Sequence, residues 1–175
     1  MLTKKEIQKE IERNNLVENF CDLKTQLQPN GFDLTVDKIF AFKSKGKIDF
    51  SNSERVLPEC EEIKAEKEKE DDEYGWWKLK KGVYKVRTNE KVNLPNDLLG
   101  ILFCRSSLLR VGSFTKHGLI DSGFSGFLEF ILKVENDNGM DLKENARVSQ
   151  VIFRKVKETE AYDGEYNDKE NSDSK

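Results

Sequence analysis

The sequence predicts an all-β fold, a distorted jelly-roll β-barrel preceded by one short N-terminal helix. From residue 34 onward, short apolar runs rich in β-branched and aromatic residues alternate with Gly, Asn, Asp and Pro at strand-like intervals. The chain has 175 residues, which is the size of one domain able to bury a core without disulfide bonds. A capped helix is indicated only at the start.

The N-terminal residues predict a helix with recognisable ends. Thr3 is the expected N-cap, and Glu6 is its capping-box partner. Leu2 faces Ile7 as a hydrophobic staple. We expect the helix to end where Asn14-Asn15 can close it.

Five apolar runs are the clearest predicted strands, at residues 39–42, 82–86, 98–104, 126–134 and 148–156. Residues 59–73 are charge-dense and have little apolar surface to bury, so an exposed loop or a solvated helix is expected there. We predict a single domain over residues 1–167, with 59–73 as a charged surface insertion. Residues 168–175 are expected to be a polar C-terminal tail.

Charge and cysteine content exclude several classes of partner and site. The 30 basic and 33 acidic residues leave a formal net charge of -3, so no footprint for nucleic acid or an anionic membrane is visible. Cys21, Cys60 and Cys104 are odd in number and lack CxxC spacing, which favours free thiols over a disulfide framework or a zinc site. With no signal peptide or long apolar run, a soluble cytoplasmic protein is expected.

Residues 104–126 carry the strongest chemical signal. Arg105 and Arg110 offer forked donors for phosphate oxygens, while Ser106 and Ser107 offer hydroxyl and backbone N–H groups to the same oxygens. Asp121 follows in an apolar, glycine-flanked setting, where a carboxylate is expected to be desolvated and more basic. The pattern indicates an anion site next to a general base.

These segments, 105–112 and 118–126, resemble the core of the dUTPase and dCTP deaminase superfamily. Segments 28–34, 147–153 and 162–167 follow in the family's order, so the resemblance spans roughly residues 28 to 167. The mixed pattern resembles archaeal dUTPases that are similar to dCTP deaminases. The resemblance implies dUTP as the substrate, a homotrimer with sites between subunits, and Mg²⁺ held through the triphosphate with no direct protein ligand.

The resemblance also implies residue roles. Asp121 would orient the water that attacks the α-phosphate of dUTP, although a turn aspartate bonded to its own backbone is the alternative. Arg105, Ser106, Ser107 and Arg110 match the phosphate-binding turn. For Arg105, an ion pair that braces the turn or a subunit interface is an equal alternative.

Gln150 matches a family glutamine that contacts the nucleotide phosphates, and a bond to neighbouring backbone is its alternative. Strand alternation places it on the same face as Val148 and Ile152. Asp33 matches an aspartate near the metal-triphosphate region, where we expect structural bonding. His117 has no partner motif and is expected to be structural.

Gly118, Leu119, Ile120 and Phe124 match the part of the family that binds pyrimidine and deoxyribose. The glycine-flanked backbone would approach the pyrimidine and read its edge through N–H and C=O groups, although such glycines also mark bulges and tight turns. Phe124 would pack under the deoxyribose, with plain core packing as its alternative.

One acid separates the two reactions of the superfamily. Counting from Asp121, the deaminating glutamate would fall at Ile131, and counting back from Asn136 it would fall at Lys133. Glu129 shares the expected inward face of Ile131 and could replace it only through a bulge. The pattern favours hydrolysis of dUTP to dUMP and pyrophosphate. The alternatives are a dCTP deaminase, alone or bifunctional, and a catalytically silent nucleotide-binding regulator.

The C-terminal segment 162–167 resembles the tail of the deaminases, except that Glu165 stands where a lysine is usual. A carboxylate at that position would repel phosphate. Tyr162, Tyr166 and Lys169 are therefore the candidates for a C-terminal lid.

Overall fold

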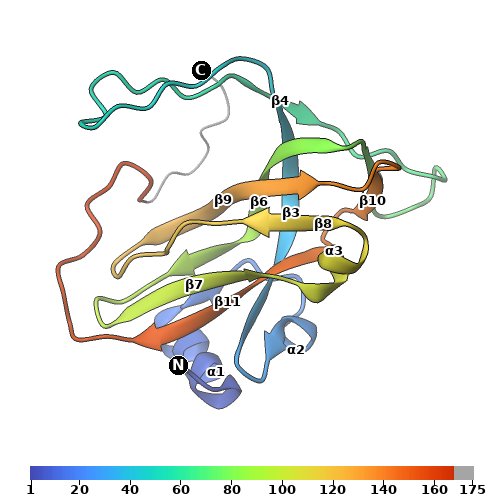
Figure 1. Cartoon of the computed structure of the whole chain (residues 1–175). Helices are drawn as coiled ribbons and strands as arrows, with labels where there is room; N and C mark the ends of the chain where they lie inside the picture. The colour runs from blue at the N-terminus through green and yellow to red at the C-terminus, as the bar shows by residue number, and fades with distance from the viewer. Residues whose placement is uncertain (168–175) are drawn as a thin grey trace.

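The computed structural model describes residues 1–167, and the predicted tail 168–175, with Lys169, lies outside the described residues (Figure 1). The helices within residues 1–167 are α1 (Lys4–Asn14), α2 (Leu23–Gln26) and α3 (Ser106–Arg110). The strands are β1 (Val17–Glu18), β2 (Leu27–Gln28), β3 (Gly31–Phe42), β4 (Cys60–Ile63), β5 (Trp76–Leu79), β6 (Gly82–Asn93), β7 (Leu98–Cys104), β8 (Ser113–Lys116), β9 (Ser125–Val134), β10 (Met140–Lys143) and β11 (Arg147–Lys155).

The main sheet has the strand order β7-β11-β3-β6-β9-β8, while β1 joins β6, and β2 and β4 join β3. Its two end strands come back together, because Gly100 in β7 and Ile120, just after β8, exchange both backbone hydrogen bonds at 2.9 and 3.0 Å. This bridge nearly closes the sheet into a barrel. The predicted all-β barrel with one N-terminal helix is confirmed.

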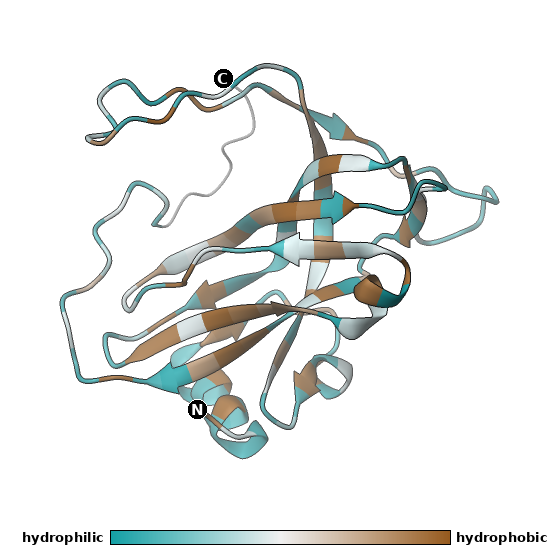
Figure 2. Cartoon of the chain, viewed as in Figure 1, coloured by the Kyte–Doolittle hydropathy of each residue, from teal (hydrophilic) through white to brown (hydrophobic). Residues whose placement is uncertain are grey.

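The core lies inside the curved sheet. Residues along β9 alternate between buried and more exposed positions, as the period-two geometry of a strand requires. Figure 2 shows hydrophobic residues along β7, β9 and β11, with hydrophilic residues among them in β9 and β11, whereas the loop between β4 and β5 is mainly hydrophilic. The largest fully buried apolar side chains include Phe32, Leu34, Ile39, Leu132 and Phe153. Burying each of them stabilises the fold by about 1.5–3 kcal/mol.

Helix α1 has the predicted ends. The Thr3 N–H and hydroxyl both donate to the Glu6 carboxylate at 2.8 Å. Leu2 and Ile7 are both buried, as a hydrophobic staple requires. Asn15 closes the helix in the left-handed region with φ 51°, where asparagine is tolerated better than most residues. The N-terminal Leu2 N–H also donates to the Phe153 carbonyl of β11 at 2.8 Å, which ties the helix to the barrel.

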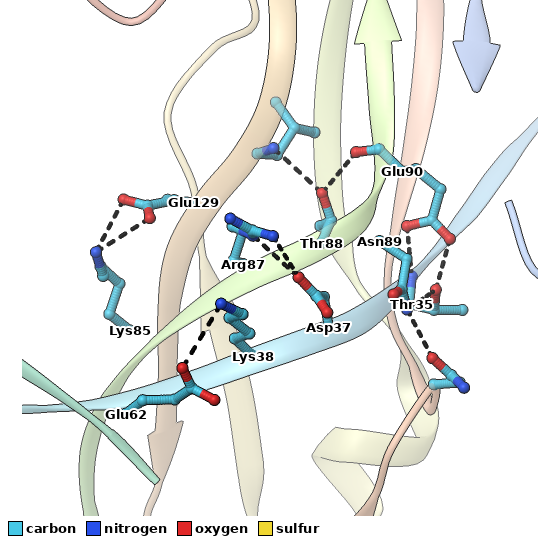
Figure 3. Close-up of polar contacts among 12 residues, drawn as sticks. Thr35, Asp37, Lys38, Glu62, Lys85, Arg87, Thr88, Asn89, Glu90 and Glu129 are labelled. Atoms are coloured by element: carbon cyan, nitrogen blue, oxygen red, sulfur yellow. Dashed lines mark hydrogen bonds and ion pairs between the residues drawn. The ribbon is translucent and has the colours of Figure 1, made fainter. Parts of the chain in front are cut away.

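A buried polar network crosses β3 and β6 (Figure 3). The Glu90 carboxylate accepts from the Thr35 N–H and hydroxyl at 2.9 and 2.6 Å. It also accepts from the Gln26 amide at 2.6 Å. Burial raises the pKa of Glu90 above its ordinary value, although these donors act in the opposite direction. The network lies where the register between β6 and β9 shifts between Arg87 and Lys91, so Glu90 occupies a bulge in β6.

The expected features differ from the structure in two places. Strand β3 begins earlier than the apolar run at 39–42, and β6 runs longer than the run at 82–86. Both strands include buried polar residues that bond across the sheet, such as Thr35 in β3 and Glu90 in β6. Residues 59–73 are not simply a loop or a helix: Cys60–Ile63 form β4, which pairs with β3. In the part that follows β4, residues 66–71 are all exposed. No helix within residues 1–167 is long and apolar enough to cross a membrane.

Candidate active site

The predicted phosphate turn is helix α3, which begins directly after β7. Arg105 occupies its N-cap, and the Arg105 N–H donates to the Val148 carbonyl of β11 at 3.1 Å. Leu108 is buried and anchors the turn in the core. The side chains that remain face solvent and have no hydrogen-bond partner within the described chain: Ser106, Ser107 and Arg110.

Asp33 in β3 gathers three polar side chains behind this turn. Its Oδ2 lies 3.2 Å from Arg105 Nε and 3.1 Å from Arg147 Nη1, while Gln150 Nε2 donates to its Oδ1 at 3.0 Å. The Asp33 side chain is only 1% exposed. The bracing ion pair that was one of two expectations for Arg105 is therefore present. The Gln150 amide bonds a carboxylate and not the neighbouring backbone.

The predicted common face of Val148, Gln150 and Ile152 in β11 is present for Gln150 and Ile152 but not for Val148. Ser149, Val151 and Phe153 face inward, whereas Gln150 and Ile152 are less buried. Val148 is buried despite the expected common face, because the register between β11 and β3 shifts between Arg147 and Ser149.

Asp121 lies in the loop between β8 and β9, and it is exposed. The expected desolvated setting is wrong for a single chain, because Leu119 is 57% exposed and Ile120 turns inward against Gly100. Within the described residues its carboxylate accepts no hydrogen bond. The turn is closed instead by its backbone carbonyl, which accepts from the Phe124 N–H at 3.2 Å.

The backbone of this loop is only partly available to a ligand. In the bridge to Gly100, the Ile120 N–H donates to the Gly100 carbonyl, and the Ile120 carbonyl accepts from the Gly100 N–H. Gly118 is open, since a Cβ there would meet nothing within 4 Å. Gly123 has φ +78°, and a Cβ there would lie 2.6 Å from the Ala161 side chain.

The C-terminal segment 156–167 packs against the same loop. The Tyr162 N–H donates to the Ser122 carbonyl at 2.8 Å, and the ring of Tyr162 lies 5.8 Å from that of Phe124. Asn167 Oδ1 accepts from the Ser125 N–H at 2.7 Å. Between the loop and this segment lies an open pocket of about 530 Å³ lined by Asp121.

The loop between β3 and β4 holds the end of this segment. Arg55 forms an ion pair with Glu165, and its guanidinium lies 5.7 Å from the centre of the Tyr166 ring. The unusual carboxylate at position 165 is therefore neutralised within the chain. Tyr162 and Tyr166 thus lie on the Asp121 side of the barrel.

The expected site residues form two groups at opposite ends of β7. The Asp121 loop is bound to Gly100 near the start of the strand, and the phosphate turn begins at Ser106 after its end. A strand advances by about 3.3 Å per residue, so the two groups lie about 20 Å apart. Figure 1 shows α3 and the β8–β9 loop at the two ends of the barrel face formed by β7 and β8. The pocket at Asp121 is lined by none of the predicted phosphate-binding residues.

Sequence reasoning missed a hydroxyl network around His117. Its Nε2 lies 2.8 Å from the Ser149 Oγ, which lies 2.9 Å from the Thr115 Oγ1. The ring packs edge-on against Phe130 with centroids 4.7 Å apart, and burial lowers the pKa of His117 to about 4. The available signal was Ser149, because a hydroxyl on the inward face of a strand needs a partner.

The register of β9 decides which residue occupies the predicted deaminase position. Glu129 pairs with Arg87 and Ile131 with Lys85 without a shift between them, so no bulge brings Glu129 into that place. Glu129 accepts from the Lys85 ammonium at 3.0 and 3.1 Å (Figure 3). The two residues share a face as expected, but this face points outward in the single chain and Ile131 is 38% exposed.

Comparison with known proteins places this geometry in a family. The family model described as dCTP deaminase-like matches residues 1–156. The chain belongs to the dCTP deaminase-like family. A protein of Archaeoglobus fulgidus named probable deoxyuridine 5'-triphosphate nucleotidohydrolase is 39% identical over 175 residues, covering 99% of each chain. A protein of Methanococcoides burtonii with the same name is 44% identical over 153 residues, covering 86% of each.

A solved structure shows the same dCTP deaminase-like fold. The 2'-deoxycytidine 5'-triphosphate deaminase from Agrobacterium tumefaciens superposes with a TM-score of 0.66 at 18% identity. The superposition covers 89% of this chain and 47% of that chain. The family match includes both groups of site residues, while Tyr162 and Tyr166 lie beyond its end.

Proposed function

We propose that this chain is a dUTP diphosphatase, which hydrolyses dUTP to dUMP and pyrophosphate. One observation carries the proposal: β9 runs in regular register past Ile131, so an apolar side chain stands where a deaminase needs an acid, while Asp121 is retained. The two archaeal relatives named as nucleotidohydrolases support the same reaction.

In this proposal Asp121 is the catalytic base. Its carboxylate would accept a proton from a water molecule and aim the water oxygen at the α-phosphorus. The bond between that phosphorus and the oxygen bridging to the β-phosphate would break, and pyrophosphate would leave with the electron pair. Such general-base assistance typically contributes about 10²- to 10⁴-fold.

The partition of the site into two groups supports an assembly with sites between chains. In one chain, Asp121 and the phosphate turn lie about 20 Å apart. A triphosphate is at most roughly 10 Å long, about the rise of three strand residues, so it cannot contact both groups of one chain. We propose a closed homotrimer in which the phosphate turn of one copy faces the Asp121 loop of the next.

The remaining site residues have roles consistent with this arrangement. Phe124, half-buried against Tyr162 beside the pocket, would pack under the deoxyribose. The open backbone at Gly118 and Leu119 would face the pyrimidine. Ile120 would act by holding the loop to Gly100 and not by reading the base.

Mg²⁺ is the proposed cofactor. Among residues 1–167 no three His, Cys, Asp or Glu side chains converge, and the Asp33 carboxylate is already shared by two arginines and a glutamine. The ligands would therefore be phosphate oxygens and water, as Mg²⁺ commonly prefers. The ion, when bound, would neutralise charge on the leaving pyrophosphate. Cys21, Cys60 and Cys104 are free thiols, which supports the proposed cytoplasmic location.

A direct assay tests the reaction. With Mg²⁺, the full chain should release pyrophosphate from dUTP and no ammonia from dCTP. Hydrolysis in ¹⁸O-labelled water should place the label on dUMP, because attack is expected at the α-phosphorus. Ammonia release from dCTP, lost in Glu129→Gln, would show a deaminase and overturn the proposal.

A complementation experiment tests the site between chains. Asp121→Asn and Arg110→Ala should each be inactive alone. Mixed assemblies formed from equal amounts should recover activity at about a quarter of the sites, because a site with both intact halves takes one half from each variant. A site contained in one chain would give no recovery.

A further inference from the structure

The Asp33 cluster combines burial with an excess of positive charge. One carboxylate, 1% exposed, lies between two guanidinium groups, and the third partner, Gln150, is neutral. The side chains of Arg105 and Arg147 are 25% and 32% exposed. The cluster therefore keeps one positive charge in excess at the solvent-facing side of a buried anchor.

Each arginine uses only part of its donor set inside the chain. Arg105 gives Nε to Asp33 and Nη1 to the Arg147 carbonyl, at 3.2 and 3.1 Å. Arg147 gives Nη1 to Asp33 and to the Thr25 carbonyl, at 3.1 and 3.0 Å. The Nη2 groups of both arginines have no partner among residues 1–167. A guanidinium has five donors in a rigid fork, so each keeps a free edge for an oxyanion.

The position of these free donors points to the phosphate turn. Arg105 immediately precedes Ser106 and Ser107, whose hydroxyls are also unpaired within the described chain. Arg147 lies beside Arg105, because both guanidinium groups pair with the same Asp33 Oδ2. Without a shared anion between them, two guanidinium groups at this separation would repel each other and spread apart.

We propose that Asp33 is a positioning residue that holds Arg105 and Arg147 side by side, and that Arg147 is thereby a further contact for the substrate's polyphosphate. The inference rests on the proposed function, in which this end of β7 binds the triphosphate. It adds Asp33 and Arg147 to that site in defined roles. Gln150 is held by the same carboxylate, so its free Oε1 end is placed by Asp33 as well.

The first test is Arg147→Gln in the full chain, with Arg154→Gln as the matched control. Arg154 lies on the same strand, is exposed and has no ion pair within the described residues. Binding is measured by isothermal titration with inorganic pyrophosphate. Arg147→Gln should weaken pyrophosphate binding about tenfold, the scale of one charge-assisted contact, while Arg154→Gln should leave it unchanged. Equal affinity in the two variants would remove Arg147 from the site.

The second test is Asp33→Asn, with Asp37→Asn as its control on the same strand. Asp37 also accepts from an arginine, since Arg87 Nε and Nη2 lie 3.0 and 2.7 Å from its Oδ2, but it is remote from the turn. Asp33→Asn should weaken pyrophosphate binding at least about tenfold and raise the KM for dUTP more than it lowers kcat. Deoxyuridine, which lacks phosphate, should bind both variants as it binds the unmodified chain.

The outcomes separate this inference from the proposed function. A purely structural Asp33 would lower thermal stability without changing pyrophosphate affinity, or would weaken deoxyuridine binding equally, and either result overturns the inference. If Asp33→Asn does not fold, Arg147→Gln decides. If both variants lose pyrophosphate binding but the unmodified chain does not hydrolyse dUTP, the anion site is supported and the proposed reaction is refuted. If the unmodified chain hydrolyses dUTP and both Asp33→Asn and Arg147→Gln bind pyrophosphate with full affinity, the proposed reaction is supported and this inference is refuted.

Discussion

The two ends of β7 hold the side chains of the proposed site in opposite ways. At the α3 end, Arg105, Arg147 and Gln150 are fixed by one buried carboxylate. At the other end, Asp121 is exposed and its carboxylate has no hydrogen-bond partner within residues 1–167. The proposed anion-binding groups are therefore preorganised inside a single chain, whereas the proposed base is left open to water.

The difference follows from charge. Several cations can be kept together only if an anion already lies among them, and fixing long side chains in advance reduces the entropy lost on binding. A single carboxylate meets no such repulsion. Its loop is positioned through the backbone instead, by the bridge to Gly100 and by the Tyr162–Ser122 hydrogen bond.

The largest expected effect comes from removing the base at the open end. Asp121→Asn keeps the size of the side chain and loses its basicity, so kcat for dUTP should fall at least about 10²-fold, or about 2.7 kcal/mol in barrier. Binding of a non-hydrolysable dUTP analogue and the melting temperature should be unchanged, because the residue is exposed. Unchanged turnover would leave the loop with a structural role only.

The next effect tests how the loop is held. Gly123→Ala should destabilise the chain by about 1–2 kcal/mol through its positive φ, and its Cβ should displace the segment at Ala161. Thermal unfolding and limited proteolysis after residue 156 measure both consequences. Gly118→Ala is the matched control for stability, because a Cβ there meets nothing within 4 Å. Equal stability of the two variants would show that the C-terminal segment does not depend on this contact.

A smaller effect concerns His117, which lies between the two groups of site residues and contacts Ser149 of β11. The pKa of His117 is lowered from 6.5 to about 4 by burial, so the folded state holds the neutral ring. Its contribution to stability is present above pH 6.5 and is lost as the pH falls from 6.5 toward 4, because the unfolded chain takes up the proton first. We expect a loss of about 1 kcal/mol over that range, after allowance for solvent screening.

The measurement is thermal stability as a function of pH for the unmodified chain and for His117→Gln. Glutamine can still bond Ser149 but does not titrate, so its curve should be flatter between pH 6.5 and 4. Parallel curves would mean that His117 is not buried as neutral imidazole. Carboxylates such as Glu90 titrate in both proteins, so their effect on stability cancels when the two stability–pH curves are subtracted.

The smallest effect concerns the ion pair that holds the C-terminal segment. Glu165→Gln should raise the KM for dUTP by a few-fold at most, since a partly exposed ion pair contributes about 0–1 kcal/mol. Raising the salt concentration should reduce the difference from the unmodified chain. Asp163→Asn, an exposed acid in the same segment, is the control and should behave as the unmodified chain.

Local signals in the sequence were reliable predictors of the fold. The capping box at Thr3, the staple at Leu2 and Ile7, and the runs that became β7, β9 and β11 each depend on neighbouring residues, and all are present. The extent of β3 was harder to predict, because its polar residues bond across the sheet. Thr35, for example, bonds Glu90, which is distant in the chain.

The candidate site was predictable in its composition and not in its arrangement. The apolar neighbours of Asp121 indicated a buried carboxylate, but Leu119 and Ile120 point in opposite directions and leave it exposed. The residues around Arg105 fit both an ion pair and a phosphate contact. Only the pairing of β11 with β3 and with β7 shows that Asp33 reaches Arg105, Arg147 and Gln150. The outward face of Ile131 likewise depends on how the sheet curves. The roles of the site residues in catalysis remain predictions.

The span of β7 has a consequence for how the protein would behave at low concentration. Because the strand holds the two halves of the site about 20 Å apart, no bending of a loop can bring them together in one chain. In the proposed assembly a lone chain is therefore a folded but silent half-enzyme. Specific activity per chain should fall on dilution below the dissociation constant of the assembly, and added excess of an inactive but assembly-competent chain should restore part of it.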